Sequence, residues 1–215
     1  MDTVESGKEK QSAYRKEYAR LKKALKNEFY LEAIAICYAI MEDRLLSFFH
    51  HAGIVSRNSI KLKVNHAVYP HLRKLLNKND DQVIYIGKIS VKESLVCHLL
   101  TMSENTAMEI DRYIADLPQK KRKDRASPGY MVDLYCQIHK TIEIDLIVDI
   151  FYDLKPWIED RNQLIHALLN KTTASSELAK KRCAENGYAL ARALDNCLVK
   201  PFKTGNTLRK KYRIQ

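Results

Sequence analysis

Apolar side chains recur every three or four residues through most of this chain, and that spacing restricts its fold more than any other feature. The pattern is clearest between residues 28 and 51, where one side carries Leu31, Ile34, Ala35, Tyr38, Met41, Leu45, Phe48 and Phe49. A helix of 3.6 residues per turn gathers such positions on one face, which then packs against a neighbour. Turn-forming residues are scarce, because the 215 residues include only 6 Gly and 5 Pro. We therefore predict an all-α fold, an up-and-down helical bundle.

The same spacing predicts how the chain is divided into helices. A basic helix is expected before the 28–51 helix, with a break near Asn27. That basic helix is expected over residues 8–26, and the further predicted helices lie around Pro70–Leu76 and over residues 90–117, 130–154 and 174–199. Pro156 is expected to lie in the first turn of another helix, where proline is tolerated. Two runs, Val83–Ile86 and Ile142–Ile150, fit either a strand or a helix.

Basic residues outnumber acidic ones, 37 to 26, and they are concentrated in three segments. Residues 8–26 hold eight basic and two acidic side chains, and residues 119–125 hold five basic and one acidic. Residues 200–215 hold six basic side chains and no acidic one, and we expect them to form a C-terminal tail. Three such segments favour a nucleic acid as partner. A membrane surface is disfavoured, because no bulky apolar face accompanies the basic segments.

Several other classes of protein are disfavoured by the sequence. The five cysteines are scattered without a C-x-x-C pair, which favours reduced thiols in the cytoplasm. Apolar runs stay below the roughly 18 residues that span a membrane, and residues 1–5 have no signal-peptide character. Glycine-rich phosphate-binding motifs are absent, and His66 and His71 lack companion ligands at metal-binding spacing. We therefore predict neither a cofactor nor a metal.

The segment from Arg161 to His166 places polar groups on an apolar-faced helix. One stripe of that helix carries Trp157, Ile158, Leu164, Ile165, Leu168 and Leu169. Arg161 falls near the middle of this stripe, where a guanidinium needs an opposite charge or a bound anion. Asn162 and His166 share the adjoining flank. A fixed cation, an amide and a titratable imidazole together suit phosphate chemistry.

Glu42 is a second charge on an apolar stripe, that of the 28–51 helix. A carboxylate among Leu, Met and Phe side chains requires a partner. A contact between Glu42 and Arg161 or His166 would provide one. Two interpretations remain open: an ion pair inside the bundle without chemistry, and a carboxylate that orients catalytic groups.

Arg161-x4-His166, with Asn162 directly after the arginine, resembles the R-x(4–6)-H motif of the HEPN superfamily. The segment Tyr38–Leu45 is similar to the second helix of such domains, and the resemblance in architecture covers about residues 20–200. Arg44 and His50 also fit the spacing, but Leu45 stands where the motif has a polar residue, so we favour Arg161 and His166. Some family members carry a modified Tyr four residues after the histidine. Asn170 stands there in this chain, so that mode of control is not expected.

The resemblance implies a single HEPN-like domain over residues 1–215 that forms a homodimer and acts as a metal-independent endoribonuclease. Such enzymes serve as toxins or phage-defence effectors, which implies an antitoxin or regulatory partner. An RNA 2′-hydroxyl attacks the adjacent phosphorus and leaves a 2′,3′-cyclic phosphate. His166 would act as general acid or base, and Arg161 would hold the phosphate. Asn162 would position the phosphate or the imidazole, and Glu42 would orient the catalytic groups.

The resemblance also implies RNA contacts outside the motif. The predicted RNA-binding residues are those of the basic loop: Lys120, Lys121, Arg122, Lys123 and Arg125. The C-terminal tail would add phosphate contacts that weaken with salt. The alternative is a catalytically inactive helical module that binds RNA or a protein partner through its basic surfaces.

Overall fold

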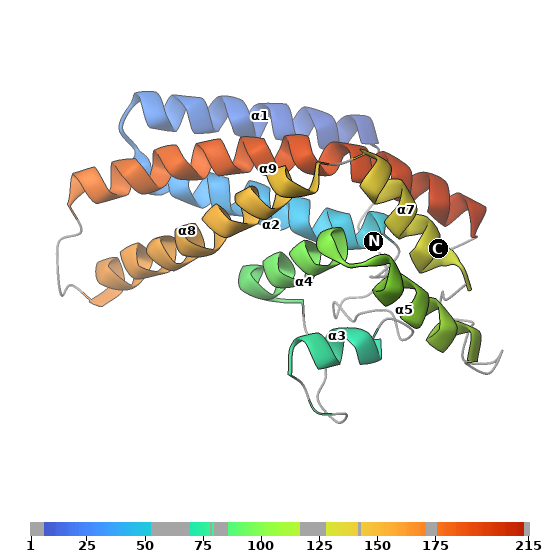
Figure 1. The fold of residues 1–215 in the computed structure, drawn as a ribbon. Coiled ribbons are helices and arrows are strands. Elements are labelled where there is room, and N and C mark those ends of the chain that lie inside the picture. Colours follow the sequence, from blue (N-terminus) through green and yellow to red (C-terminus); the bar gives the residue numbers. More distant parts are fainter. Residues whose placement is uncertain are drawn as a thin grey trace, which may run out of the picture. The chain divides into compact units, whose positions relative to one another are not determined.

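Helices make up most of the part of the chain that the structure describes. A computed structural model describes residues 7–52, 69–77, 79, 86–116, 128–141, 143–170 and 176–212. These residues form eight helices and no strand: α1 (Gly7–Lys26), α2 (Tyr30–His51), α3 (Tyr69–Leu75), α4 (Ile89–Thr101), α5 (Glu104–Asp116), α7 (Tyr130–Thr141), α8 (Ile144–Asn170) and α9 (Glu177–Lys211) (Figure 1). The predicted all-α fold class is confirmed. Within the described residues, no helix has the length and apolarity that a membrane crossing requires.

Internal contacts divide the chain into two compact units. Unit 1 comprises Met1–Asp43 and Asp153–Leu194, and unit 2 comprises Arg44–Tyr152 and Asp195–Gln215. Helices α2, α8 and α9 each contribute residues to both units. The single domain over residues 1–215 remains a prediction.

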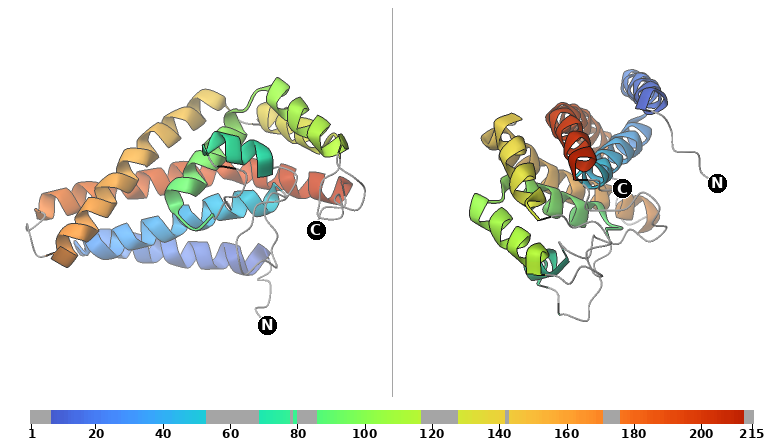
Figure 2. Two further views of the ribbon diagram at one scale, coloured as in Figure 1. Left: turned by 90° about the horizontal axis from the view of Figure 1, so that it is seen from below. Right: turned by 90° about the vertical axis from the view of Figure 1, so that its right-hand side faces the viewer.

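Unit 1 holds α1, the first part of α2, the second part of α8 and the first part of α9. The chain direction alternates through these four segments, as the colours of Figure 1 show. Figure 2 shows α1 alongside α2, and the Tyr18 hydroxyl on α1 donates to the Ala191 carbonyl on α9 over 3.0 Å. The buried core of this unit includes Leu21, Ile34, Met41, Leu154, Trp157, Ile158, Ala184 and Ala191.

The turn between α1 and α2 is closed by backbone hydrogen bonds. Glu28 has a left-handed backbone, with φ of 59°. Its N–H donates to the Leu25 carbonyl over 3.2 Å, and the Phe29 N–H donates to the Ala24 carbonyl over 2.8 Å. This pair of bonds is the Schellman motif that commonly ends helices, here without the usual glycine. The break predicted near Asn27 is confirmed.

In unit 2, a buried carboxylate joins α5 to α7. The side chain of Asp111 on α5 accepts hydrogen bonds from the backbone N–H of Met131 over 3.1 Å and of Val132 over 2.8 Å. These N–H groups lie in the first turn of α7, where a helix offers no internal acceptor. Burial nevertheless raises the pKa of Asp111, against the lowering effect of the backbone bonds. The carboxylate thus fixes where α7 begins.

The single helix predicted over residues 90–117 is wrong, because α4 ends at Thr101 and α5 begins at Glu104. Met102 has an extended backbone, with φ of −60° and ψ of 150°. The Ser103 hydroxyl then accepts the Thr106 N–H over 3.2 Å, which caps the new helix. The apolar register continues across the break, so periodicity alone concealed it.

The predicted helix boundary at Pro156 is also wrong. Helix α7 ends at Thr141, and α8 begins at Ile144 and continues through Pro156 to Asn170. Proline removes one helical N–H, but the ring is exposed and the apolar face on both sides of it is buried. Packing therefore holds the helix continuous, and a strand over Ile142–Ile150 is excluded for residues 144–150. Val83–Tyr85 lie outside the described residues.

Helix α9 is longer than predicted. It runs to Lys211, so residues 200–211 of the expected tail are helical. Its end is attached to α7, because the Tyr212 hydroxyl donates to an Asp133 carboxylate oxygen over 2.6 Å. Lys211 donates to the same carboxylate, and these bonds hold the pKa of Asp133 below its usual range.

Two half-buried histidines of unit 2 should make the protein less stable in mild acid. The Nε2 atoms of His71 on α3 and His98 on α4 lie 2.8 Å apart. Burial lowers the pKa of both imidazoles from 6.5; Glu109 opposes the effect at His71, whereas Lys74 adds to it. The unfolded chain therefore binds more protons than the folded one just below pH 6.5.

We expect the free energy of unfolding to fall as the pH drops below about 6.5. His98→Gln should flatten this fall, because the amide does not titrate. Urea unfolding between pH 7 and pH 5 measures both slopes. Equal slopes for the wild type and the variant would contradict the prediction.

Candidate functional site

Arg161 lies on α8 in unit 1 and is fixed by two neighbours. Its guanidinium carbon lies 4.2 Å from the centre of the Tyr38 ring on α2. Its Nη1 donates to the Asn162 side-chain oxygen over 2.9 Å. Its Nε is buried and makes no hydrogen bond with a residue that the structure describes. The guanidinium is therefore held in place by a ring face and by one hydrogen bond, while part of its donor capacity remains unused.

Asn162 and His166 are exposed on one flank of α8. They are four residues apart, so they lie on one side of the helix and on successive turns. Arg161 and His166 are five residues apart, which places them about 140° apart around the helix axis. The hydrogen bond from Arg161 to Asn162 connects the inward-facing cation to this exposed flank. The predicted apolar stripe is buried at Trp157, Ile158 and Leu164, whereas Leu168 is 42% exposed.

Glu42 belongs to the same part of unit 1. It is half-buried on α2, one turn after Tyr38. Burial raises the pKa of the Tyr38 hydroxyl most, the Glu42 charge raises it further, and the Arg161 charge lowers it. Glu42 and Arg161 therefore both act on one ring. A direct contact of Glu42 with Arg161 or His166 remains a prediction.

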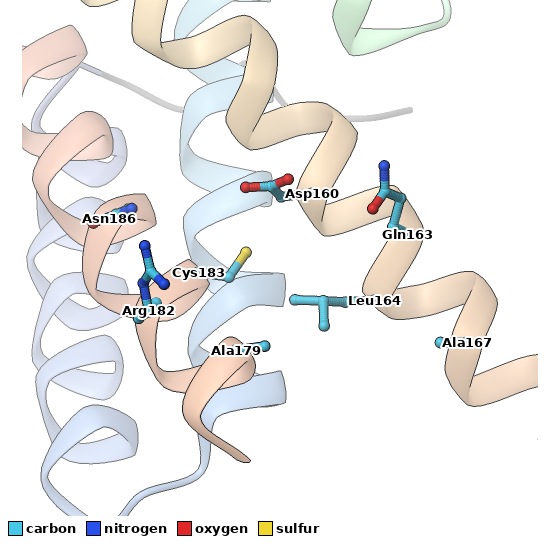
Figure 3. Close-up of a pocket in the computed structure, with 8 residues that line it drawn as sticks. All are labelled: Asp160, Gln163, Leu164, Ala167, Ala179, Arg182, Cys183 and Asn186. Carbon is cyan, nitrogen blue, oxygen red and sulfur yellow. The ribbon is translucent and has the colours of Figure 1, made fainter. Parts of the chain in front are cut away.

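A pocket of about 480 Å³ lies beside this segment, between α8 and α9 within unit 1. Figure 3 shows its lining: Asp160, Gln163, Leu164 and Ala167 from α8, and Ala179, Arg182, Cys183 and Asn186 from α9. No pattern in the sequence had singled out its polar residues. Asp160 directly precedes the motif, and Arg182 and Asn186 stand four residues apart, a spacing that brings both to one face of a helix. Asn162 and His166 lie on the other flank of α8 and do not line the pocket.

The cysteine in this pocket is a poor nucleophile. Burial raises the pKa of the Cys183 thiol to about 11, with Asp160 raising it further and Arg161 lowering it. Burial likewise raises the pKa of Cys37 to about 12. Both thiols are protonated near neutral pH, and a thiol is a much weaker nucleophile than a thiolate.

Arg44, the arginine of the second motif-like spacing, has a structural partner. Its Nη2 lies 2.7 Å from an Asp195 carboxylate oxygen in unit 2. The two side chains are 14% and 15% exposed, so the ion pair is largely shielded from solvent. Asp43 accepts hydrogen bonds from Lys10 and Tyr14 on α1.

The residues predicted to bind RNA in the basic loop, Lys120 to Arg125, lie outside the described residues. Comparison of the chain with protein-family models, curated proteins and solved structures gives no significant match.

The Arg161–Tyr38 contact predicts a difference between two substitutions. Tyr38→Phe keeps a ring under the guanidinium, whereas Tyr38→Leu removes the cation–π interaction. We expect Tyr38→Leu to lower the free energy of unfolding by about 1 kcal/mol more than Tyr38→Phe. Urea unfolding of both variants measures the difference. Equal stabilities would show that the contact contributes nothing.

Proposed function

We propose that this protein is a metal-independent endoribonuclease of the HEPN type, acting as a toxin or phage-defence effector. The observation that carries the proposal is the arrangement at Arg161: a guanidinium held on the Tyr38 ring and bonded to Asn162. Asn162 and His166 share the exposed flank beside it. A cation that holds the phosphate and an imidazole that transfers protons are groups suited to phosphate-ester cleavage by a 2′-hydroxyl.

In this proposal each residue has a separate role. His166 removes the proton from the 2′-hydroxyl or protonates the leaving 5′-oxygen, roles that suit an imidazole near neutral pH. Arg161 donates to the non-bridging phosphate oxygens, where negative charge develops. Asn162 positions the guanidinium, and Glu42 acts through the Tyr38 region as a positioning residue.

The proposal includes a homodimer. Within one chain, Arg161 faces Tyr38 and His166 lies on an exposed flank, so one copy leaves the two groups pointing apart. A second copy related by a two-fold axis would bring another histidine and arginine to the same cleft. Sedimentation equilibrium tests this part, and a monomer at the concentrations where RNA is cleaved contradicts it.

A second candidate is an inactive helical module that binds RNA or a protein. The same geometry favours it in one respect, because the Tyr38 ring and Asn162 already satisfy part of Arg161. An arginine that only stabilises the packing of α8 on α2 would look the same. Catalysis distinguishes the two candidates, since the inactive module binds RNA without cleaving it.

The proposal is tested with RNA and DNA strands of one sequence. The attacking group is the 2′-hydroxyl, so RNA should be cut and DNA should remain intact. Denaturing gels of both strands, incubated with the purified protein, show the result. Cleavage of DNA at a comparable rate would contradict the mechanism, and intact RNA would leave the inactive module as the better account.

A further inference from the structure

The outer face of α1 carries a basic stripe, which we define as Arg15, Lys16, Lys22, Lys23 and Lys26. All five side chains are exposed. At about 100° per residue they fall within an arc of about 120°, and they extend about 16 Å along the axis. Between Ser12 and Lys26 this arc contains no acidic residue. None of the five forms an ion pair with a residue that the structure describes, whereas Arg20, outside the arc, pairs with Glu32 over 2.8 Å.

The opposite face of α1 is occupied by the protein itself. Tyr18, Leu21 and Ala24 are buried in unit 1. Lys10 and Tyr14 bind Asp43 on α2, and Tyr18 bonds to α9. The basic stripe therefore faces away from the part of unit 1 on which α1 packs.

An exposed aromatic ring stands at the end of the stripe. Phe29 follows the α1–α2 turn and is 58% exposed. Its backbone is fixed on both sides, because its N–H donates to the Ala24 carbonyl and its carbonyl accepts the Ala33 N–H over 3.0 Å. Burial raises the pKa of the Tyr30 hydroxyl most, and the Glu28 carboxylate of the same turn raises it further. A backbone fixed on both sides thus presents an exposed phenyl ring three residues after Lys26, the last residue of the stripe.

We propose that the basic stripe and Phe29 together bind single-stranded RNA, with phosphates along the stripe and a base stacked on the Phe29 ring. The proposal rests on the proposed function, for which it names the substrate class and the surface. Rows of cations with an aromatic platform are how proteins hold single strands without reading their sequence. A duplex offers phosphates but no free base face, so it should bind more weakly than a single strand.

An anionic membrane is the competing partner for a basic helix. Binding at a membrane surface requires an apolar helix face that enters the lipid, and that face of α1 is buried in unit 1. Among the described residues from Gly7 to Phe29, Phe29 is the one large apolar side chain that is exposed, which is little for membrane anchoring. The observations therefore favour RNA.

The test uses the His166→Ala protein, so that binding is measured without cleavage. In one variant the five stripe residues are changed to Gln. A matched control removes five exposed lysines elsewhere: Lys88, Lys155, Lys181, Lys203 and Lys210. Fluorescence anisotropy with a labelled single-stranded RNA gives the affinity at several salt concentrations.

The stripe variant should lose affinity on the order of 100-fold, and its salt dependence should decrease by about 3 to 4 in the log–log slope, near 0.7 for each lost phosphate contact. The control should lose much less, although its net charge falls equally. Phe29→Ala should lose about tenfold with an unchanged slope, and Phe29→Trp should bind normally. Equal losses in stripe and control variants would overturn the proposal.

Vesicles containing phosphatidylserine supply the remaining arm. Stripe-dependent binding to vesicles with unchanged RNA affinity would overturn the proposal in favour of a membrane. The proposed catalytic function can fail separately. If the wild type binds RNA through the stripe but leaves it intact, the RNA-binding surface is supported and the ribonuclease activity is contradicted. If a stripe variant that retains His166 cleaves RNA normally with an unchanged KM, the RNA-binding surface is contradicted and the proposed ribonuclease activity stands.

Discussion

His166→Ala is expected to slow RNA cleavage by about 10²- to 10⁴-fold, the usual contribution of a positioned general acid or base. Because His166 is exposed on α8, its removal should leave the free energy of unfolding nearly unchanged. The measurement is the single-turnover cleavage rate of a labelled RNA, together with a thermal melt of each protein. A loss of rate without a loss of stability identifies a chemical role.

Two matched variants make this result specific. Lys155→Ala changes another exposed position of α8 and should cleave at the wild-type rate. His50→Ala tests the second motif-like spacing, whose arginine already pairs with Asp195. If His50→Ala abolished cleavage while His166→Ala retained it, the assignment of the motif would be wrong.

Trp157→Ala is expected to cost about 3–5 kcal/mol of stability, as large-to-small changes at buried aromatic residues do. Trp157 is 4% exposed, and its indole N–H donates to the Cys183 carbonyl over 2.8 Å. It lies one turn before Arg161 and joins α8 to α9 beside the pocket. Circular dichroism during urea unfolding measures the loss, since the variant has no tryptophan fluorescence.

The partner of this ring, Gly187, gives a sharper form of the same prediction. A Cβ at Gly187 would lie 2.8 Å from Cζ2 and 2.9 Å from Nε1 of Trp157. Gly187→Ala should therefore destabilise the wild type by about 1–3 kcal/mol through overpacking. In a Trp157→Leu background the ring is gone, and the same change should stabilise by about 1 kcal/mol through helix propensity. The same sign in both backgrounds would contradict this packing.

Periodicity predicted the helices where a single buried face continued without interruption. Residues 8–26 and 28–51 became α1 and α2 almost at the predicted bounds, because Leu21, Met41 and Phe48 are fully buried. It failed where local chemistry overrides periodicity. A serine cap divided the 90–117 helix at Ser103, and packing carried α8 through Pro156.

For the candidate site, the sequence indicated which residues to examine but not their partners. The position of Arg161 on an apolar stripe predicted an opposite charge or a bound anion beside it. One of its neighbours is instead the Tyr38 ring, which carries no charge. The pocket with Asp160 and Arg182 was missed, because its two walls come from α8 and α9 and their pairing depends on tertiary packing. The exposure of the Phe29 ring could likewise not be predicted from the sequence, because it depends on the turn at Glu28.

The central claim is that Arg161 and His166 cleave RNA through its 2′-hydroxyl without a metal. The most direct measurement is the chemistry of the product ends after incubation with RNA in excess EDTA, for the wild type, Arg161→Ala and His166→Ala. We predict 2′,3′-cyclic phosphate and 5′-hydroxyl ends from the wild type and none from either variant. Products with 5′-phosphate ends, or cyclic phosphates that persist in both variants, would contradict the claim.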